Sequence, residues 1–210
     1  MFFDSGNTGI DALLGTAADL AAGRLKASAP PLLLPDKKIV LVTAHRRENF
    51  GRPIERICDA LSALALRPDV QIVFPVHPNP RVRAAVFGKL ANTPNVTLLD
   101  PLNYVDFVDL MRRSHLILTD SGGIQEEAPA LGKPVLVLRD STERPEAIEA
   151  GASRIVGSDT RRIVRAVEEL LTNEGRYVRM AQPRYLFGDG NAAERIVATL
   201  GEDIYQSAAA

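Results

Sequence analysis

Short apolar runs alternate with segments of helical periodicity through most of the chain. In the helical segments, apolar residues recur every three or four positions, whereas the short runs are almost continuously apolar, as buried strands are. Strands of this kind, separated by helices, are typical of parallel sheets covered on both faces. We therefore predict an α/β fold with a Rossmann-like, doubly wound parallel sheet. The expected strands are 38–44, 70–76, 95–100, 115–120 and 134–139, and the expected helices between them are 53–66, 81–91, 104–114 and 122–132.

The two ends of the chain have a different character. An alanine- and leucine-rich helical segment, Thr8–Leu25, is followed by a connector with three prolines, "SAPPLLLPDKK". The last third is more helical, with one-sided apolar faces at 160–173 and 191–205. We expect three parts: a helix and connector at 1–36, the sheet domain at 37–190, and a C-terminal helix and tail at 191–210.

The residues that follow each expected strand are unusually polar and rich in glycine and proline. In a doubly wound sheet, ligands bind outside the carboxyl ends of the strands, so these residues form the expected site. They are His45–Asn49, His77–Pro80, Pro101–Leu102, Asp120–Gly123 and Arg139–Arg144.

The composition of the chain limits the classes of partner that we expect. The net charge is −1 and no long run of one sign occurs, so we expect no nucleic-acid partner. Apolar runs are too short to cross a bilayer and no signal-peptide pattern stands at the start, so we expect no membrane association. The single cysteine, Cys58, suits a reducing compartment and is interpreted as a buried core residue. A cytoplasmic protein with a small ligand is the expectation.

The stretch "TDSGGIQEE" combines a hydroxyl, two glycines and two carboxylates at a strand-to-helix turn. Gly122 and Gly123 leave backbone N–H groups open to an anion where the helix dipole is positive, and Ser121 adds a donor. A plain tight turn is the alternative. Glu126 and Glu127 either stabilise the helix start or accept hydrogen bonds from ligand hydroxyls. The sequence does not decide which of the two faces the cleft.

Histidines follow two successive strands. His45 in "TAHRREN" and His77 in "PVHPNP" occupy matching positions, and the arginines beside His45 suit bidentate phosphate contacts. A structural histidine in a solvated loop is the alternative for each. His115 starts a strand at the opposite edge and is interpreted as structural.

The sequence lacks the motifs of several other kinds of active site. No catalytic triad can be assembled, no metal-ligand spacing such as His-Glu-x-x-His occurs, and the G-x-G-x-x-G fingerprint of nicotinamide cofactors is missing after the first strand. No cofactor and no metal are implied. The residues alone predict a cleft for phosphate and hydroxyl groups.

Taken together, "HRREN", "PVHPNP", "DPLNYVDF", "TDSGGIQEEAPALGKPVLVLRDSTERPEA" and "GDGNAAERI" resemble the non-hydrolysing UDP-N-acetylglucosamine 2-epimerase family. The resemblance extends from "GNTGIDALL" at Gly6 over nearly the whole chain. It implies one domain of a glycosyltransferase-B-type fold, in which two Rossmann-like domains enclose the active site. It also implies elimination of UDP from UDP-N-acetylglucosamine and its re-addition with inverted C2.

The resemblance assigns a role to each matching residue. His45 is the implied catalytic group; with Arg47 and His77 it would hold the diphosphate and assist its departure. Leu102 and Phe107 would frame the uracil. The implied phosphate and ribose contacts are Ser121, Gly122 and Gly123 for phosphate, Glu127 for the ribose hydroxyls and Arg144 facing the nucleotide.

The matching region is only the carboxyl-terminal half of that family, whose amino-terminal half carries the carboxylates thought to move the C2 proton. We therefore expect this chain to bind UDP and to be inactive alone, as a truncation, a half gene or one piece of a split enzyme. The expected partners are a missing N-terminal half or further copies in a homo-oligomer, through 8–25 or the last helix. A free-standing UDP-sugar binding or regulatory module and a glycosyltransferase half remain the alternatives.

Overall fold

The computed structural model describes residues 3–28 and 33–208. The described strands are β1 (Lys38–Thr43), β2 (Val70–Pro75), β3 (Val96–Leu99), β4 (Leu116–Thr119), β5 (Val135–Val137) and β6 (Ser153–Ile155). The described helices are α1 (Thr8–Ala21), η1 (Arg47–Asn49, a 3-10 turn), α2 (Arg52–Leu64), α3 (Pro80–Leu90), α4 (Tyr104–Arg113), α5 (Gly122–Ala130), α6 (Pro145–Glu149), α7 (Thr160–Thr172), α8 (Glu174–Met180) and α9 (Ala192–Ala208).

The strands form one parallel sheet in the order β3-β2-β1-β4-β5-β6. The chain starts in the middle, moves outward to β3 and then returns to β4 on the other side of β1. The registers of β1 with β2 and β4 pair Val40 with Ile72 and with Leu116. The order reverses between β1 and β4, which is where doubly wound sheets bind ligands.

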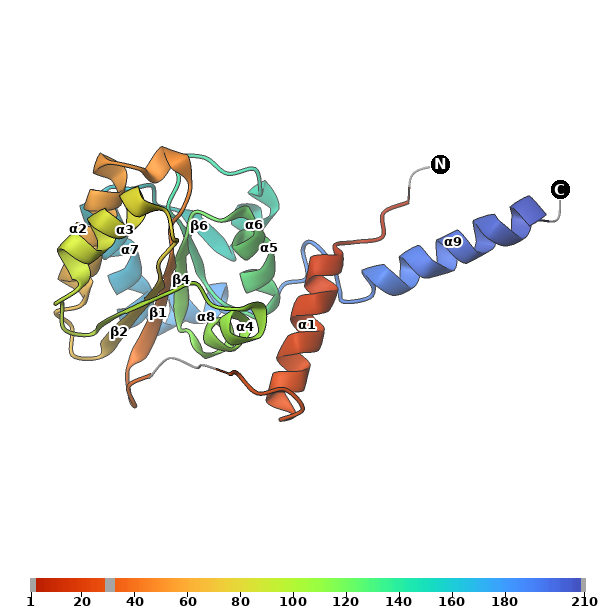
Figure 1. Cartoon of the computed structure of the whole chain (residues 1–210), viewed down its shortest axis with the longest axis horizontal. Helices are drawn as coiled ribbons and strands as arrows, with labels where there is room; N and C mark the ends of the chain where they lie inside the picture. Colours follow the sequence, from red (N-terminus) through yellow and green to blue (C-terminus); the bar gives the residue numbers. More distant parts are fainter. Residues whose placement is uncertain (1–2, 29–32, 209–210) are drawn as a thin grey trace.

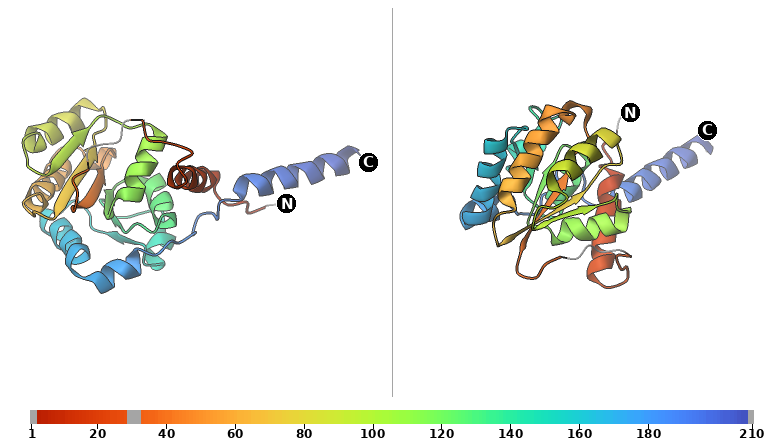
Figure 2. Two further views of the ribbon diagram at one scale, coloured as in Figure 1. Left: turned by 90° about the horizontal axis from the view of Figure 1, so that it is seen from below. Right: turned by 60° about the vertical axis from the view of Figure 1, so that its left-hand side comes forward.

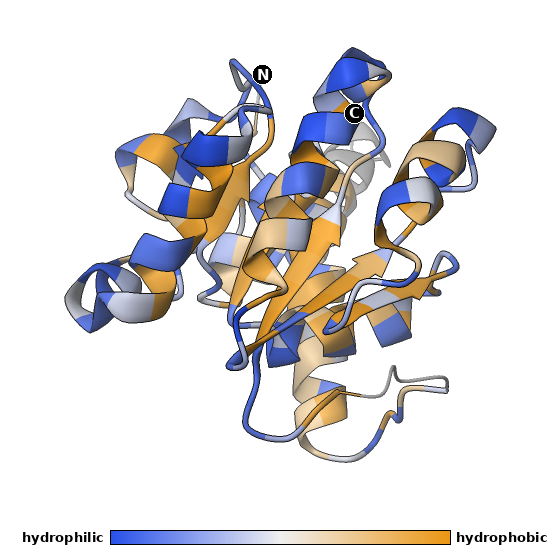
Figure 3. Ribbon diagram, turned by 90° about the vertical axis from the view of Figure 1, so that its left-hand side faces the viewer, coloured by the Kyte–Doolittle hydropathy of each residue, from blue (hydrophilic) through white to orange (hydrophobic). Residues whose placement is uncertain are grey.

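Helices cover both faces of this sheet (Figures 1 and 2). One core lies between the sheet and α2, α3 and α7, and the other between the sheet and α1, α4 and α5. Hydrophobic residues accordingly fill the strands at the centre, while the helices turn hydrophilic residues outward (Figure 3). Helix α2 alone buries Ile54, Ile57, Leu61 and Leu64, each contributing about 1.5–3 kcal/mol of hydrophobic stabilisation.

Most of the sequence prediction is confirmed by the fold. The predicted sheet and its first five strands are present, and Cys58 is buried in α2, where burial raises its pKa to about 12. Strand β6 and helices α6 and α8 were not predicted, since three to seven residues are too few to show a period. The prediction that the first helix reaches Leu25 was wrong.

That helix ends at Ala21 because the chain turns there. Ala22 is the C-cap and Gly23 has a φ of +71°, a left-handed conformation that glycine adopts without strain. The backbone N–H groups of Arg24 and Leu25 both bond the carbonyl of Asp19. Of the proline-containing connector that follows, residues 29–32 lie outside the described part of the chain.

The two ends of the chain meet at α1. The N–H of Asn7 donates to the Phe187 carbonyl at 3.0 Å. The carboxylate of Asp11 accepts from the N–H groups of Ala192 and Ala193, so a residue of α1 caps the first turn of α9.

From this junction, α9 extends away from the α/β body beyond α1 (Figures 1 and 2). Two of its apolar residues are exposed to solvent: Val197 is 70% exposed and Leu200 is 56% exposed. Within the described residues, no helix has both the length and the apolar character needed to span a membrane.

Candidate functional site

Two loops meet at the point where the strand order reverses. One follows β1 and carries His45, Arg46 and η1; the other follows β4 and leads directly into α5. Because α2 and α5 leave for opposite faces of the sheet, the two loops diverge and open a crevice between the carboxyl ends of β1 and β4. The candidate site lies in this crevice.

Asp120 joins the two loops. Its fully buried carboxylate accepts from the N–H groups of His45 at 2.9 Å and Arg46 at 2.8 Å, and from the Asn49 amide at 2.8 Å. The Nδ1 atom of His45 lies 3.2 Å from the same carboxylate. A carboxylate that contacts Nδ1 fixes the ring and leaves Nε2 to contact a ligand. Asp120 therefore positions His45.

The start of α5 is a turn whose geometry suits an anion. The β1 and β4 ends are joined by a hydroxyl contact of 2.6 Å between Thr43 and Thr119, and the Thr119 hydroxyl also accepts from the Ser121 N–H. Ser121 is the N-cap residue, but its own side chain caps no helical N–H. Its hydroxyl and the first N–H groups of α5, beginning at Gly122, are thus available to an anion.

Two guanidinium groups lie over Gly122. A Cβ atom at this residue would stand 3.5 Å from Nη2 of Arg46 and 3.7 Å from Nη2 of Arg144. Positive charge therefore gathers at a helix start that already favours anions. Arg47, the arginine singled out in the sequence, lies exposed at the start of η1, one residue further from the turn.

The two predicted histidines lie side by side. The rings of His45 and His77 are stacked, with centroids 5.7 Å apart and planes 18° apart. Both line a cavity of about 210 Å³ together with Leu102, Phe107 and Ile124. One wall is imidazole and the other apolar, so the cavity suits a flat, partly polar ring next to a charged group.

The structure distinguishes the two adjacent glutamates. Glu126 is engaged: its carboxylate accepts from the Asn7 side-chain amide at 2.6 Å and forms an ion pair with Arg144. Glu127 has no hydrogen bond or ion pair with another described residue. Its burial, and then the charge of Glu126, raise the pKa of Glu127 to about 7. Its charge in turn contributes, after burial, to raising the pKa of Tyr104.

The loop after β5 is held next to the crevice by Arg139. This side chain is 8% exposed and binds Glu48 of η1 at 2.6 Å and Glu143 at 2.6 Å. These two ion pairs hold the 139–144 loop against the loop that follows β1. The pKa of Glu143 is lowered to about 2, chiefly by its hydrogen bond to Arg139.

Of the predicted site residues, the structure brings one set into the cavity and another around the start of α5. The cavity contains His45, His77, Leu102 and Phe107. Around α5 are Ser121, Gly122, Gly123, Glu127 and Arg144. The sequence reasoning missed Asn7; it placed Asp120 and Arg46 at the site but did not predict that Asp120 holds the loop after β1. His115 lies elsewhere: its ring stacks on Tyr177 at 4.0 Å, and burial lowers its pKa to about 4.

Comparison with known proteins shows which family this chain belongs to. Residues 2–201 match the model of the family described as UDP-N-acetylglucosamine 2-epimerase. The UDP-N-acetylglucosamine 2-epimerase of Escherichia coli K12 is 52% identical over 204 residues, which cover 94% of this chain and 54% of that protein. The chain thus spans about half the length of the curated relatives it matches.

Solved structures agree. The UDP-GlcNAc 2-epimerase of Neisseria meningitidis, crystallised bound to UDP-GlcNAc, superposes with a TM-score of 0.88 and 45% identity, covering 94% of this chain and 54% of that one. The Methanocaldococcus jannaschii enzyme, in complex with UDP-GlcNAc and UDP, gives 0.77 and 32%, covering 95% and 54%. The sheet described above is therefore one Rossmann-like domain of a glycosyltransferase-B-type fold.

Proposed function

Because the chain belongs to the UDP-N-acetylglucosamine 2-epimerase family, we propose that it is the nucleotide-binding half of such an enzyme. Its ligand is the UDP part of UDP-N-acetylglucosamine, held in the crevice between the β1 and β4 loops. The observation that carries the proposal is the convergence of stacked histidines, an uncapped serine and two guanidinium groups on one helix start.

Each part of the nucleotide has a matching environment. The cavity beside Leu102 and Phe107 takes the uracil, since it is the apolar part of the crevice. The diphosphate lies between the histidines and the turn at Ser121 and Gly122, where N–H groups and arginines converge.

We assign the binding of the ribose hydroxyls to Glu127. A carboxylate beside a diphosphate repels it, but it binds neutral hydroxyls well, because an ionised carboxylate only accepts hydrogen bonds. Glu126 is already used by Asn7 and Arg144, whereas Glu127 lacks a described partner. The structure thus supports the same glutamate that the family resemblance implies.

The chemistry proposed for the whole enzyme is loss of UDP from C1 and of the proton from C2, followed by re-addition with the opposite configuration at C2. This chain supplies stabilisation of the departing diphosphate: His45, oriented by Asp120, and the cations at Gly122 offset the negative charge that develops on the leaving oxygen. The group that removes the C2 proton is not among the proposed site residues. We therefore expect binding without turnover.

Isothermal titration of the purified chain with UDP, followed by an assay for UDP-N-acetylmannosamine, tests this proposal. Saturable binding that is weakened by Ser121→Ala and unaffected by Arg113→Gln is expected; Arg113 is an exposed residue of α4 that pairs only with Asp109 among the described residues. The absence of saturable UDP binding would refute the nucleotide site. Epimerisation by the chain alone would refute the division of labour.

We also propose that α9 is an association surface, either for an amino-terminal half like that of the longer relatives or for a second copy of this chain. Its exposed Val197 and Leu200 form an apolar strip on a helix that leaves the body of the domain. Analytical ultracentrifugation tests this: a monomer at all concentrations that also fails to bind a separately produced N-terminal half would refute it. The cytoplasmic location expected from the sequence stays a prediction.

A further inference from the structure

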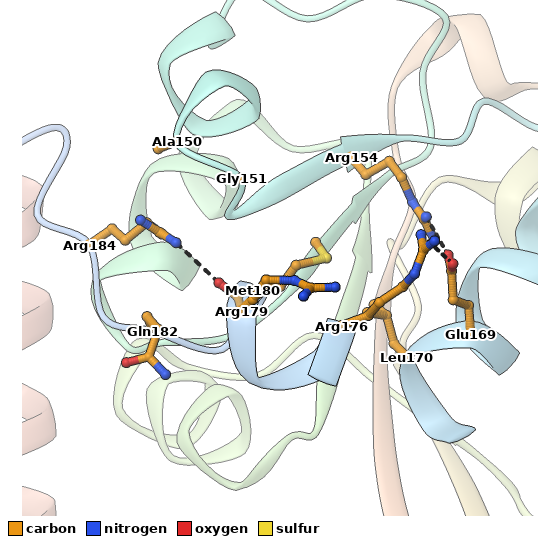
Figure 4. Close-up of a pocket in the computed structure, with 10 residues that line it drawn as sticks. All are labelled: Ala150, Gly151, Arg154, Glu169, Leu170, Arg176, Arg179, Met180, Gln182 and Arg184. Atoms are coloured by element: carbon orange, nitrogen blue, oxygen red, sulfur yellow. Dashed lines mark hydrogen bonds and ion pairs between the residues drawn. The ribbon is translucent and has the colours of Figure 1, made fainter. Parts of the chain in front are cut away.

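A second, larger cavity lies at the opposite edge of the sheet. It has a volume of about 510 Å³ and is bounded by the start of β6, the end of α7, and α8 with the chain that follows it (Figure 4). The crevice described above lies at the carboxyl ends of the strands, whereas this cavity lies beside Gly151, just before β6 begins. Its size falls in the usual range for small-molecule sites.

The cavity has an excess of positive charge. Four arginines line it, and Glu169 is the single carboxylate among the lining residues. Glu169 binds Arg154 at 2.6 Å and Arg176 at 2.5 Å, so it is shared by two of them. Arg179 and Arg184 have no carboxylate partner among the described residues. Figure 4 shows the Arg179 side chain extending along the cavity toward Arg176.

Structural roles explain only part of this cluster. Arginines near helix ends bind terminal carbonyls, and here Nη2 of Arg184 donates to the Arg179 carbonyl in the last turn of α8 at 3.1 Å. Nη2 of Arg154 donates to the Ala166 carbonyl in the middle of α7 at 3.2 Å. The Nε atoms of Arg154 and Arg184, however, are buried and have no hydrogen-bond partner among the described residues. Such an unsatisfied N–H donor is stabilised when an acceptor reaches it.

We propose that this cavity binds a phosphate group, free or carried on a small organic molecule. Guanidinium groups bind phosphate oxygens through pairs of parallel hydrogen bonds, and an anion placed among Arg176, Arg179 and Arg184 offsets charge that Glu169 leaves uncompensated. Leu170 and Met180 form an apolar wall that accommodates an organic part. The proposal does not depend on the nucleotide site.

The test is a titration of the ¹⁵N-labelled chain with inorganic phosphate and, separately, with ribose 5-phosphate at constant ionic strength. Binding is followed at the arginine Nε–Hε signals and at the backbone amides of Ser121 and Gly122. Saturable shifts at Arg179 and Arg184 are expected. Tighter binding of ribose 5-phosphate identifies an organic phosphate as the ligand, and equal binding identifies the free anion; both support the phosphate site.

Two variants and one control complete the design. Arg179→Gln is expected to weaken binding about tenfold or more, and Arg179→Lys, which keeps the charge but loses the paired donors, by a smaller factor. Arg161→Gln is the control, because Arg161 is exposed on the first turn of α7, away from the cavity. Shifts that do not saturate, shifts confined to Ser121 and Gly122, or equal binding by Arg179→Gln and the wild type would each overturn the proposal.

Discussion

The affinity of the crevice for a ribose should rise with pH through neutrality. Glu127 has a pKa of about 7, because burial and then the charge of Glu126 disfavour its ionised form. Ribose hydroxyls donate to the ionised carboxylate, whereas the protonated group has lost acceptor capacity. Below pH 7 the ligand must therefore compete with a proton, and above pH 7 it does not.

The size of the effect follows from the pKa. If only the ionised form binds, the dissociation constant is about tenfold larger near pH 6 than near pH 8, and almost constant above that. The sign is fixed by linkage: a ligand that prefers the ionised form binds better as protons become scarce, and reciprocally lowers the pKa of Glu127 when it binds.

The assay uses uridine rather than UDP. Uridine has no phosphate, so the ionisation of a phosphate does not enter the comparison. Binding is measured by NMR titration at several pH values, for the wild type and for Glu127→Gln. A second ligand, 2′,3′-dideoxyuridine, lacks both hydroxyls and serves as the matched control.

The pH dependence is expected in the wild type with uridine and should vanish both in Glu127→Gln and with the dideoxy ligand. The same slope in the variant would show that another group titrates. Tighter binding at low pH would refute the assignment of Glu127 to the ribose.

Two further predictions concern the frame of the site and the fold. Asp120→Asn places an amide where a carboxylate accepts three N–H groups, so UDP affinity should fall about tenfold or more and the fold should lose about 2–3 kcal/mol, measured by titration and by urea unfolding. Gly188→Ala would bring a Cβ within 3.1 Å of the Asn7 nitrogen and should destabilise the fold by about 1–3 kcal/mol. Its control, Gly15→Ala, has open space around it in α1 and should stabilise by about 0.5–1 kcal/mol; equal effects of the two changes would contradict the packing argument.

The sequence predicted the sheet because its strands are buried on both faces and therefore apolar throughout. It also predicted where the site lies, since strand ends of a parallel sheet meet at one edge. It could not choose between neighbours such as Arg46 and Arg47. Adjacent residues have nearly the same place in the sequence pattern, so the pattern does not distinguish them. Which of the two faces the site depends on partners that are distant in sequence. For Glu126 such a partner is Asn7, 119 residues away.

Asn7 contacts three separate parts of the chain. Its side-chain oxygen accepts from Gly9 at 2.7 Å and so starts α1. Its backbone N–H holds Phe187, in the segment that leads to α9, and its amide nitrogen holds Glu126, the neighbour of the proposed ribose carboxylate. The position of the Glu126 charge, which raises the pKa of Glu127, therefore depends on the residue that joins the two ends of the chain.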